Sequence, residues 1–252
     1  MQGIIIAAGL GSRLAPYTDN KPKCLLEVSG KTILQRTLDA FNEVGIKNIS
    51  IVRGYKKELI NFSGIKYYEN LDYKNNNILH SLFYAEPAME DSFIFSYSDI
   101  IYESNVLAKL KESDADISIV VDCSWRDAYI GRDKHPITEA ELIKAVDGSV
   151  TKIGKNVVST KEASGEFIGI AKFSKVGANI LKNEFNRLKH IYKDSLGCNF
   201  QNAKSFKKAY FTDMAQELVD RGYKIAVVEI NGGWHEIDTH QDLERSNNFF
   251  KK

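Results

Sequence analysis

Two glycines, an arginine and a lysine near the N-terminus have the types and the spacing to bind a phosphate chain. The apolar run at residues 3–8 is short, continuous and rich in isoleucine, which predicts a buried β-strand. Gly9 and Gly11 follow it and allow a tight turn whose backbone N–H groups stay open to an anion. Arg13 adds a forked, permanent cation, and Lys23 adds a point charge. We therefore predict a phosphate-binding loop at the end of the first strand.

Two other phosphate-binding motifs fit this loop less well. A P-loop ends in Gly-Lys-Ser/Thr, which the segment lacks. A dinucleotide-binding fingerprint requires a third glycine where Leu14 stands, and an acidic residue about 20 residues later, for which Glu27 is a poor candidate. The alternative without a ligand is an ordinary strand and turn of an α/β protein.

The composition limits the kinds of partner. The 252 residues include 34 basic and 33 acidic ones, and a net charge of +1 offers no electrostatic case for a nucleic acid or an anionic membrane. We find no membrane-spanning apolar run and no signal-peptide pattern. Cys24, Cys123 and Cys198 have no paired or metal-binding spacing, so we expect free thiols in a reducing cytoplasm. The oligomeric state stays open, and a homo-oligomer is possible.

Alternating strand and helix patterns predict the fold class. Up to residue 121, short apolar strands alternate with helices that have one apolar face. The predicted strands are 49–52, 65–68, 93–95 and 117–121, and the predicted helices are 32–44, 78–85 and 105–111. This order favours an α/β domain with a mixed, mostly parallel sheet flanked by helices.

The pattern changes after Asp122. Residues 123–165, including 150–153 and 157–159, are typical of short antiparallel strands and loops, which we expect as an insertion over the ligand edge of the sheet. A core strand at 167–173, helices at 176–186 and 213–221 and a strand at 225–230 complete one domain over residues 1–252.

Two aspartates are candidates to meet at the ligand edge. Asp99 follows a predicted strand, and Asp238 closes the segment Glu236-Ile237-Asp238. Ligands of open α/β sheets bind beyond the carboxyl ends of the strands. Two carboxylates beside a triphosphate suit Mg²⁺. The alternative for an aspartate after a strand is a turn or a helix cap.

The N-terminal motif resembles the signature of the nucleotidyltransferases that make NDP-sugars and CDP-alcohols. The resemblance is carried by residues 7–14 together with Pro22 and Lys23. It implies a Rossmann-like nucleotide-diphospho-sugar transferase fold with a small inserted cap. It also implies attack of an acceptor oxygen on the α-phosphorus of a nucleoside triphosphate, with Mg²⁺ held by Asp99 and Asp238. The residues that it places around the triphosphate are Ala7, Ala8, Gly9, Gly11, Ser12, Arg13 and Lys23, of which Lys23 and Arg13 are catalytic.

Residues 70–82 point to one branch of that family. They resemble the Asn-x-x-Tyr…Asn-Asn…Ser-Leu stretch of cytidylyltransferases that act on phosphocholine and 2-aminoethylphosphonate. The resemblance implies that Asn76, Asn77 and Ser81 recognise cytosine by hydrogen bonds. The alternative is a polar loop that caps the next helix.

Segments after residue 120 are similar to the acceptor-facing insertion of phosphonate-type cytidylyltransferases. In this reading Arg126 and Arg132 grip the acceptor's phosphoryl group or a carboxylate, and Glu166 and Asp213 neutralise an amine. Ordinary surface ion pairs are the alternative.

The resemblance thus implies Mg²⁺-dependent transfer of CMP from CTP to 2-aminoethylphosphonate, phosphoglutamine or phosphocholine, for capsule or other surface decoration. A hexose-1-phosphate uridylyl- or thymidylyltransferase and a non-catalytic nucleotide-binding module are the alternatives.

Overall fold

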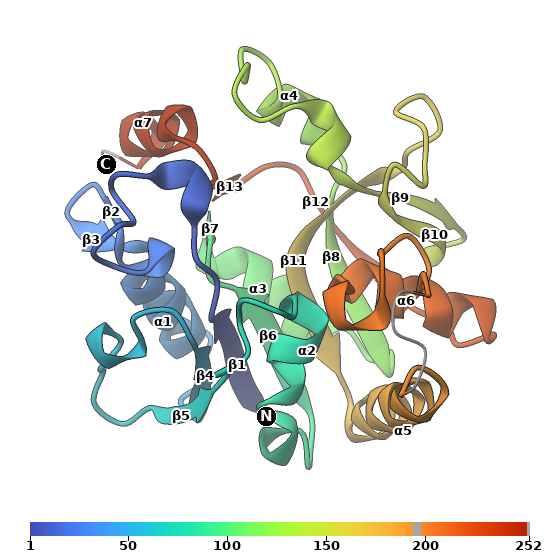
Figure 1. The fold of residues 1–252 in the computed structure, drawn as a ribbon. Helices are drawn as coiled ribbons and strands as arrows, with labels where there is room; N and C mark the ends of the chain where they lie inside the picture. The colour runs from blue at the N-terminus through green and yellow to red at the C-terminus, as the bar shows by residue number, and fades with distance from the viewer. Residues whose placement is uncertain (194–197, 251–252) are drawn as a thin grey trace.

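A nine-stranded mixed sheet runs through the centre of the molecule (Figure 1). The computed structural model describes residues 1–193 and 198–250. The strand order is β5-β4-β1-β6-β11-β8-β12-β10-β9. The bounds are β1 Gln2–Ala7, β4 Ile49–Arg53, β5 Lys66–Glu69, β6 Phe93–Tyr97, β8 Ile117–Asp122, β9 Glu141–Val146, β10 Ser149–Lys155, β11 Gly165–Phe173 and β12 Ala226–Ile230. Two small ribbons pair β2 (Glu27–Val28) with β3 (Lys31–Thr32), and β7 (Ile100–Tyr102) with β13 (Trp234–Glu236).

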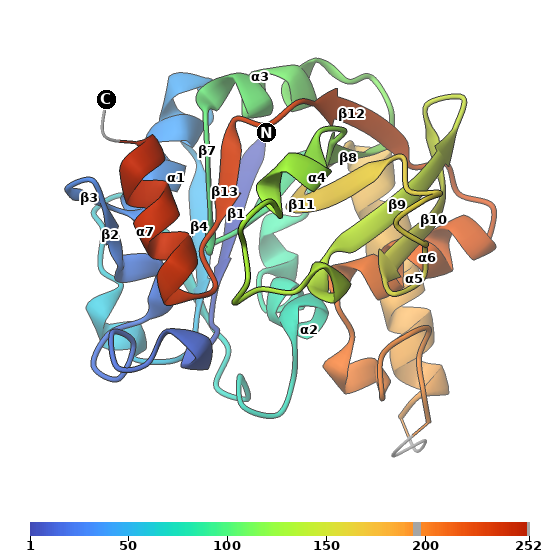
Figure 2. The same ribbon diagram turned by 90° about the horizontal axis from the view of Figure 1, so that it is seen from above.

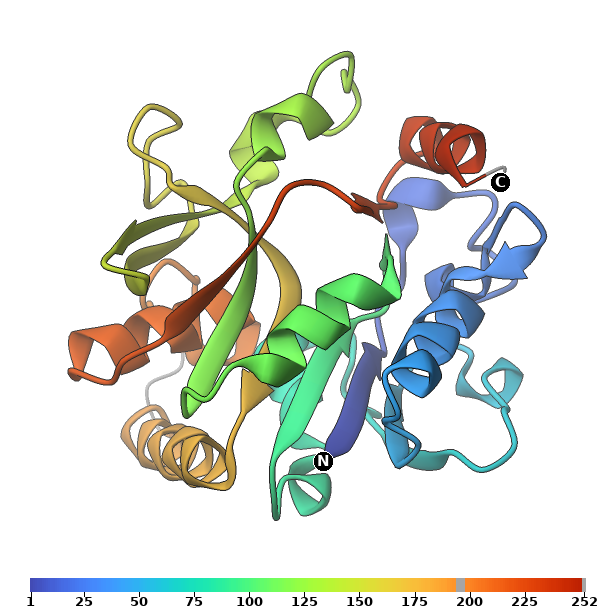
Figure 3. The ribbon, with the colours of Figure 1, turned by 180° about the vertical axis from the view of Figure 1, so that it is seen from behind.

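Helices cover both faces of this sheet (Figures 1 and 2). Their bounds are α1 Ile33–Glu43, α2 Ile78–Phe83, α3 Ser104–Glu112, α4 Trp125–Ala128, α5 Lys175–Ile191, α6 Phe211–Asp220 and α7 His240–Phe249. Successive β1 residues point to opposite faces, so Ile4 and Ile6 pack with α2, α5 and α6, while Ile5 packs with α1 and α3. The view from behind shows α3 in front of the sheet (Figure 3). In the described part of the chain, no helix is both long and apolar enough to cross a bilayer.

The predicted α/β class and mixed sheet are confirmed, but the parallel arrangement is only partial. Strands β5, β4, β1 and β6 are parallel, as are β8 and β12. Strand β11 runs antiparallel to both β6 and β8, and β10 runs antiparallel to β9 and β12. The β/α alternation that predicts parallel strands ends before this region, and hairpin-like connections take over.

Residues 123–165, which we expect as an insertion over the ligand edge, also add two strands to the sheet. The strands are antiparallel, as expected, but they are β9 and β10, and β10 pairs with β12 at the sheet edge. The predicted strand at 157–159 is wrong: Asn156 has a positive φ of 57° and turns the chain directly after β10. The assignment of one domain with an acceptor-side insertion stays a prediction.

Candidate active site

A pocket of about 640 Å³ opens at the carboxyl ends of β1 and β6. One side is lined by the glycine loop and by residues 73–81, and the other by residues of β9, β10 and β11. The residues lining it include Ala7, Ala8, Gly9, Gly11, Ser12, Arg13, Lys23, Asn76, Asn77, Ser81, Asp99, Glu166 and Asp238. All the residues that the sequence assigns to the nucleotide and the metal, with Glu166, therefore line one cavity.

The glycine loop turns tightly because Gly11 adopts a left-handed conformation. Its φ is 63°, and it caps a short 3-10 helix, Ser12–Leu14. A Cβ on Gly11 would lie 2.8 Å from the Cβ of Lys23, so a larger residue would push Lys23 away. Glycine is thus required here both for the turn and for the close approach of Lys23.

Lys23 bridges the two candidate metal ligands. Its Nζ lies 3.0 Å from Oδ2 of Asp99 and also donates to Oδ1 of Asp238, whose Oδ2 accepts from Arg13 at 2.6 Å. Burial opposes ionisation of Asp238, but Lys23 and Arg13 outweigh it and hold the pKa of this carboxyl well below its usual range. Burial likewise opposes the charge on Lys23, but Asp238 and Asp99 raise its pKa. Lys23 and Asp238 are therefore both charged at neutral pH.

The ribbon of β7 and β13 brings the two aspartates together. Glu236 stands opposite Ile100 in this antiparallel pair, and the N–H of Ile237 donates to the carbonyl of Asp99 at 2.8 Å. Asp238 follows directly, at the entrance to α7. A short connection, residues 231–233, joins β12 to β13 and can be followed in Figures 1 and 3. Residues far apart in the sequence thus meet through backbone pairing.

The donor set fits a hard divalent cation. Two carboxylates already share one cation, the Lys23 ammonium, and the Oδ1 atom of Asp99 is buried without a hydrogen-bond partner among the described residues. Oxygen ligands of this kind suit Mg²⁺. Ligand atoms of His135, Glu236 and Asp238 also lie within 4.8 Å of one another. Burial lowers the pKa of His135 to about 4, so its imidazole is neutral at pH 7.

Two of the three residues assigned to cytosine, Asn76 and Ser81, form what we call the amide network with buried Asn70. Nδ2 of Asn70 donates to Oδ1 of Asn76 at 2.8 Å and to Oγ of Ser81 at 2.9 Å, and Nδ2 of Asn76 donates back to Oδ1 of Asn70 at 3.1 Å. Asn70 is fully buried. Asn77 differs, because its Nδ2 donates to the carbonyl of Lys208 at 3.1 Å. The network holds Asn76 and Ser81 rigidly in the pocket wall.

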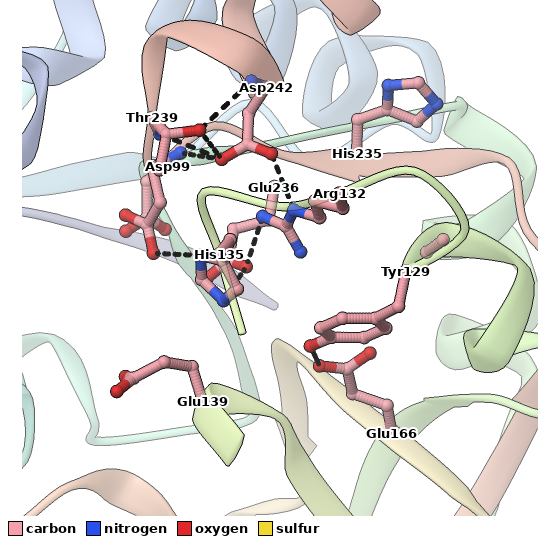
Figure 4. Close-up of polar contacts among 12 residues, drawn as sticks. Asp99, Tyr129, Arg132, His135, Glu139, Glu166, His235, Glu236, Thr239 and Asp242 are labelled. Carbon is pink, nitrogen blue, oxygen red and sulfur yellow. Dashed lines mark hydrogen bonds and ion pairs between the residues drawn. The ribbon is translucent and has the colours of Figure 1, made fainter. Parts of the chain in front are cut away.

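Three carboxylates form what we call the acidic wall of the pocket: Glu139, Glu141 and Glu166. Nζ of Lys155 lies 2.9 Å from Glu139, and Glu141 accepts from the hydroxyl of Thr212 at 3.1 Å. Glu166 accepts from the hydroxyl of Tyr129 at 2.7 Å, as the dashed line in Figure 4 marks. Burial raises the pKa of both Glu141 and Glu166 to about 7.

Three residues assigned to the acceptor lie outside the pocket lining. Arg126 is exposed, lies over the ring of Trp125 and donates to the carbonyl of Thr160. Arg132 is buried between Asp242 at 2.6 Å and Glu236 at 3.0 Å, an arrangement visible in Figure 4. Asp213 caps α6 by accepting from backbone N–H groups of Tyr210 and Asn202. Arg132 thus forms buried ion pairs, Asp213 caps a helix, and Arg126 contacts a ring and a backbone carbonyl. The assignment of these three residues to the acceptor stays a prediction.

The sequence analysis did not predict some of the residues that line the pocket. Tyr97, Lys155 and Tyr210 all line the cavity. Lys155 stands directly opposite Glu141 in the β9–β10 pair, which places both side chains on one face of the sheet. A lysine directly after the buried residues Ile153 and Gly154 was the available signal, but using it required the strand register.

The free energy of unfolding of Glu166→Gln minus that of the wild type is expected to increase as the pH rises from about 4.5 to about 7. In this range the unfolded wild-type chain loses the proton of Glu166, whereas the folded chain keeps it because burial raises the pKa to about 7. The folded state then binds more protons, so wild-type stability falls with rising pH, and the variant lacks this fall. Urea unfolding of both proteins between pH 4.5 and 8 measures it. A constant stability difference would contradict the raised pKa.

Comparisons with known proteins identify the family of the chain. The family model of the MobA-like NTP transferase domain matches residues 3–146. The CTP:phosphoglutamine cytidylyltransferase of Campylobacter jejuni is 32% identical over 97% of this chain and 98% of its own length. A UTP–glucose-1-phosphate uridylyltransferase of Haloferax volcanii is 31% identical over 51% of this chain and 57% of its own length.

The fold is also that of a solved nucleotidyltransferase. The structure of the CTP:phosphocholine cytidylyltransferase from Streptococcus pneumoniae superposes with a TM-score of 0.72 at 22% identity, and covers 99% of both chains. Two findings decide the family assignment. The family model matches more than half of the chain, and a relative that matches over nearly its full length is more than 30% identical. The chain belongs to the MobA-like NTP transferase family and is a nucleotidyltransferase.

Proposed function

We propose that this nucleotidyltransferase moves CMP from CTP to a small acceptor that has both an amino group and a phosphate or phosphonate group. The acceptor types are 2-aminoethylphosphonate, phosphoglutamine and phosphocholine. One observation supports this proposal most directly: a single pocket joins the glycine loop and its cations to the acidic wall. The first part suits a triphosphate, and the second suits a cationic acceptor.

The extent of the sequence similarity supports the cytidylyl assignment. The phosphoglutamine cytidylyltransferase matches nearly the whole chain, including β9, β10 and β11. The uridylyltransferase, at 31% identity, matches about half of it, and a solved putative glucose-1-phosphate thymidylyltransferase that covers the whole chain is 19% identical. A hexose-1-phosphate acceptor also has no positive charge for the acidic wall to bind. Both points favour the amino-bearing acceptor over the sugar phosphate.

The reaction follows from the charges in the pocket. An ionised oxygen of the acceptor attacks the α-phosphorus, the new O–P bond forms, and the bond to the bridging oxygen breaks as pyrophosphate leaves. Lys23 would stabilise the charge that grows on the α-phosphate, while Arg13 and the N–H groups of Gly11 and Ser12 would hold the β- and γ-phosphates. Mg²⁺ held by Asp99 and Asp238 would supply further neutralisation of the phosphates.

The amide network supplies the polar groups for a nucleobase. Asn76 and Ser81 line the pocket, and buried Asn70 fixes their orientation. Amide and hydroxyl groups can match both the carbonyl and the amino group on the edge of cytosine. We also propose that the enzyme works in the cytoplasm and that its product serves surface decoration, as the family resemblance implies.

Pyrophosphate release measures the proposed reaction. With Mg²⁺ and CTP, release is expected with an amino-bearing phosphate or phosphonate and not with hexose-1-phosphates. UTP and dTTP should each give at most about a tenth of the rate obtained with CTP, since the wrong base leaves buried amides unpaired. Preference for UTP or dTTP with a hexose-1-phosphate would move the chain to the sugar branch. Tight CTP binding without release from any acceptor would favour the non-catalytic module.

A further inference from the structure

His135 has a buried ring nitrogen with no hydrogen-bond partner in the part of the chain that the structure describes. The residue is 2% exposed, and the atom is Nδ1. Leaving a buried polar atom unpaired costs about 1–3 kcal/mol. The reaction proposed above uses no atom of His135. This nitrogen therefore calls for a partner that the described residues do not supply.

A measured distance joins this nitrogen to a candidate metal ligand. Nδ1 of His135 lies 3.5 Å from Oδ2 of Asp238. That spacing is longer than a good N–H···O hydrogen bond, which measures about 2.7–3.2 Å. Two donor atoms that each bind one metal ion at about 2.1 Å lie roughly 3.0–3.5 Å apart. The spacing thus suits a shared ion better than a direct hydrogen bond.

The other side of the imidazole faces a carboxylate that can orient it. Nε2 of His135 lies 3.4 Å from Oε2 of Glu236, and the same oxygen pairs with Nη2 of Arg132 at 3.0 Å. Figure 4 shows His135 next to Glu236 and Arg132. A metal-binding histidine almost always donates its second N–H to a carboxylate, a backbone carbonyl or water. With Nε2 turned to Glu236, Nδ1 keeps its lone pair for an ion.

Helix α7 anchors the loop that carries His135 beside Asp238. Oε1 of Gln241 accepts from the backbone N–H of Lys134 at 3.1 Å, and Nε2 of Gln241 donates to the carbonyl of Gly131 at 2.9 Å. Asp238 stands just ahead of the same helix. The approach of His135 to Asp238 is therefore fixed by the docking of this loop on α7.

An ion reaches these atoms from the pocket, which Asp238 and Glu236 line. Two atoms 3.5 Å apart leave no room for an organic group between them, so the shared partner is a single ion. Arg13 also pairs with Oδ2 of Asp238, at 2.6 Å, but its side chain is 50% exposed and is assigned above to the triphosphate. A triphosphate that draws Arg13 away leaves this oxygen open to an ion beside Nδ1.

We infer that His135 is a ligand of the divalent metal ion at Asp238 and binds it through Nδ1. The inference rests on the proposed function, which places the ion at Asp238. An imidazole together with carboxylates makes a mixed nitrogen–oxygen site, and such a site binds Co²⁺, Ni²⁺ or Zn²⁺ better than an all-oxygen site does. His135 then helps to decide which metal ions the enzyme accepts.

Pulsed electron paramagnetic resonance of Mn²⁺ tests the ligand directly. The sample is the wild-type protein with Mn²⁺ and CTP but without an acceptor, so that no transfer takes place. Coupling of Mn²⁺ to a nitrogen is expected. Isotopically labelled histidine should change this coupling, which excludes the nitrogens of cytosine as its source. The absence of histidine coupling, or of bound Mn²⁺, overturns the inference.

Two variants of His135 locate the nitrogen. His135→Phe keeps a ring but removes both nitrogens, so the coupling should be lost and the Mn²⁺ dissociation constant should rise at least about 10-fold. His135→Asn puts an amide oxygen in place of the nitrogen donor. The preference of this variant for Zn²⁺ over Mg²⁺, measured by displacement of Mn²⁺, should therefore be at least about 10-fold lower than that of the wild type. An unchanged coupling in His135→Phe contradicts the assignment.

His235→Asn is the matched control. His235 precedes Glu236 in β13, but neighbouring strand residues point to opposite faces, and Nδ1 of His235 lies 3.1 Å from Oγ of Ser246. Figure 4 shows its ring apart from that of His135. The control should keep the coupling, the Mn²⁺ affinity and the preference for Zn²⁺. Loss of the coupling in His235→Asn alone would assign the nitrogen to the wrong histidine.

A failure of the proposed function gives a different result. In that case no acceptor releases pyrophosphate from CTP with any metal ion, while the coupling to His135 persists. Pyrophosphate release without histidine coupling contradicts the inference and leaves the proposed function intact. The labelled wild-type protein decides between these outcomes even if His135→Phe does not fold.

Discussion

Replacing Lys23 with alanine is expected to lower kcat about 100- to 1,000-fold. Lys23 is only 12% exposed and is the one ammonium group shared by Asp99 and Asp238 in the described structure. A preorganised charge aimed at the reacting phosphate contributes an effect of this size when the site excludes water. Pyrophosphate release at saturating CTP and acceptor measures the loss. A variant with wild-type kcat would show that Lys23 has no part in the chemistry.

The same variant also reports on the metal site. Without Lys23, Asp99 loses its cation and Asp238 keeps only Arg13, so the two carboxylates lie together less well compensated in the metal-free protein. A divalent cation can replace the ammonium, so Mg²⁺ should raise the melting temperature of Lys23→Ala more than that of the wild type. Lys31→Ala is the control, because its ion pair with Asp39 is exposed and contributes at most about 1 kcal/mol.

The glycine-loop part of the pocket was predictable because its residues are close in sequence. The strand, Gly9, Gly11 and Arg13 form one continuous segment, and local sterics alone require a glycine where φ is positive. Thr32 caps α1 as its type suggests. Such local rules need no knowledge of strand pairing.

The acidic wall of the pocket was less predictable because it depends on pairing between distant strands. Glu141, Lys155 and Glu166 converge only through the antiparallel contacts of β9 with β10 and β11. The sequence also does not reveal that Arg132 faces Glu236 and Asp242 instead of the pocket. A one-residue change of register would turn these side chains to the other face, and no local pattern excludes it.

Two aspartates at the carboxyl ends of the core strands β6 and β8 are expected to respond in opposite ways to replacement by asparagine. Asp99, after β6, lines the pocket and has one unpartnered oxygen. Asp99→Asn should therefore lower kcat/KM at least about 100-fold and weaken Mn²⁺ binding, measured by electron paramagnetic resonance, with little change in stability. Retained Mn²⁺ affinity would exclude Asp99 as a ligand.

Asp122, at the end of β8, provides the matched comparison. Its Oδ1 accepts from the N–H of Gly232 at 2.9 Å and from Ser124, and its Oδ2 accepts from Nε1 of Trp234 at 2.8 Å. An asparagine NH₂ would face the indole N–H, donor against donor, so Asp122→Asn should lose about 1.5–3 kcal/mol of stability while Mn²⁺ binding is unchanged. Urea unfolding and the same resonance titration measure both quantities. If the two variants respond alike, the position of the aspartate at the end of a strand decides whether it binds metal or stabilises the fold. If they differ as expected, that role depends on the surroundings of the carboxylate, which are an open pocket for Asp99 and hydrogen-bond donors for Asp122.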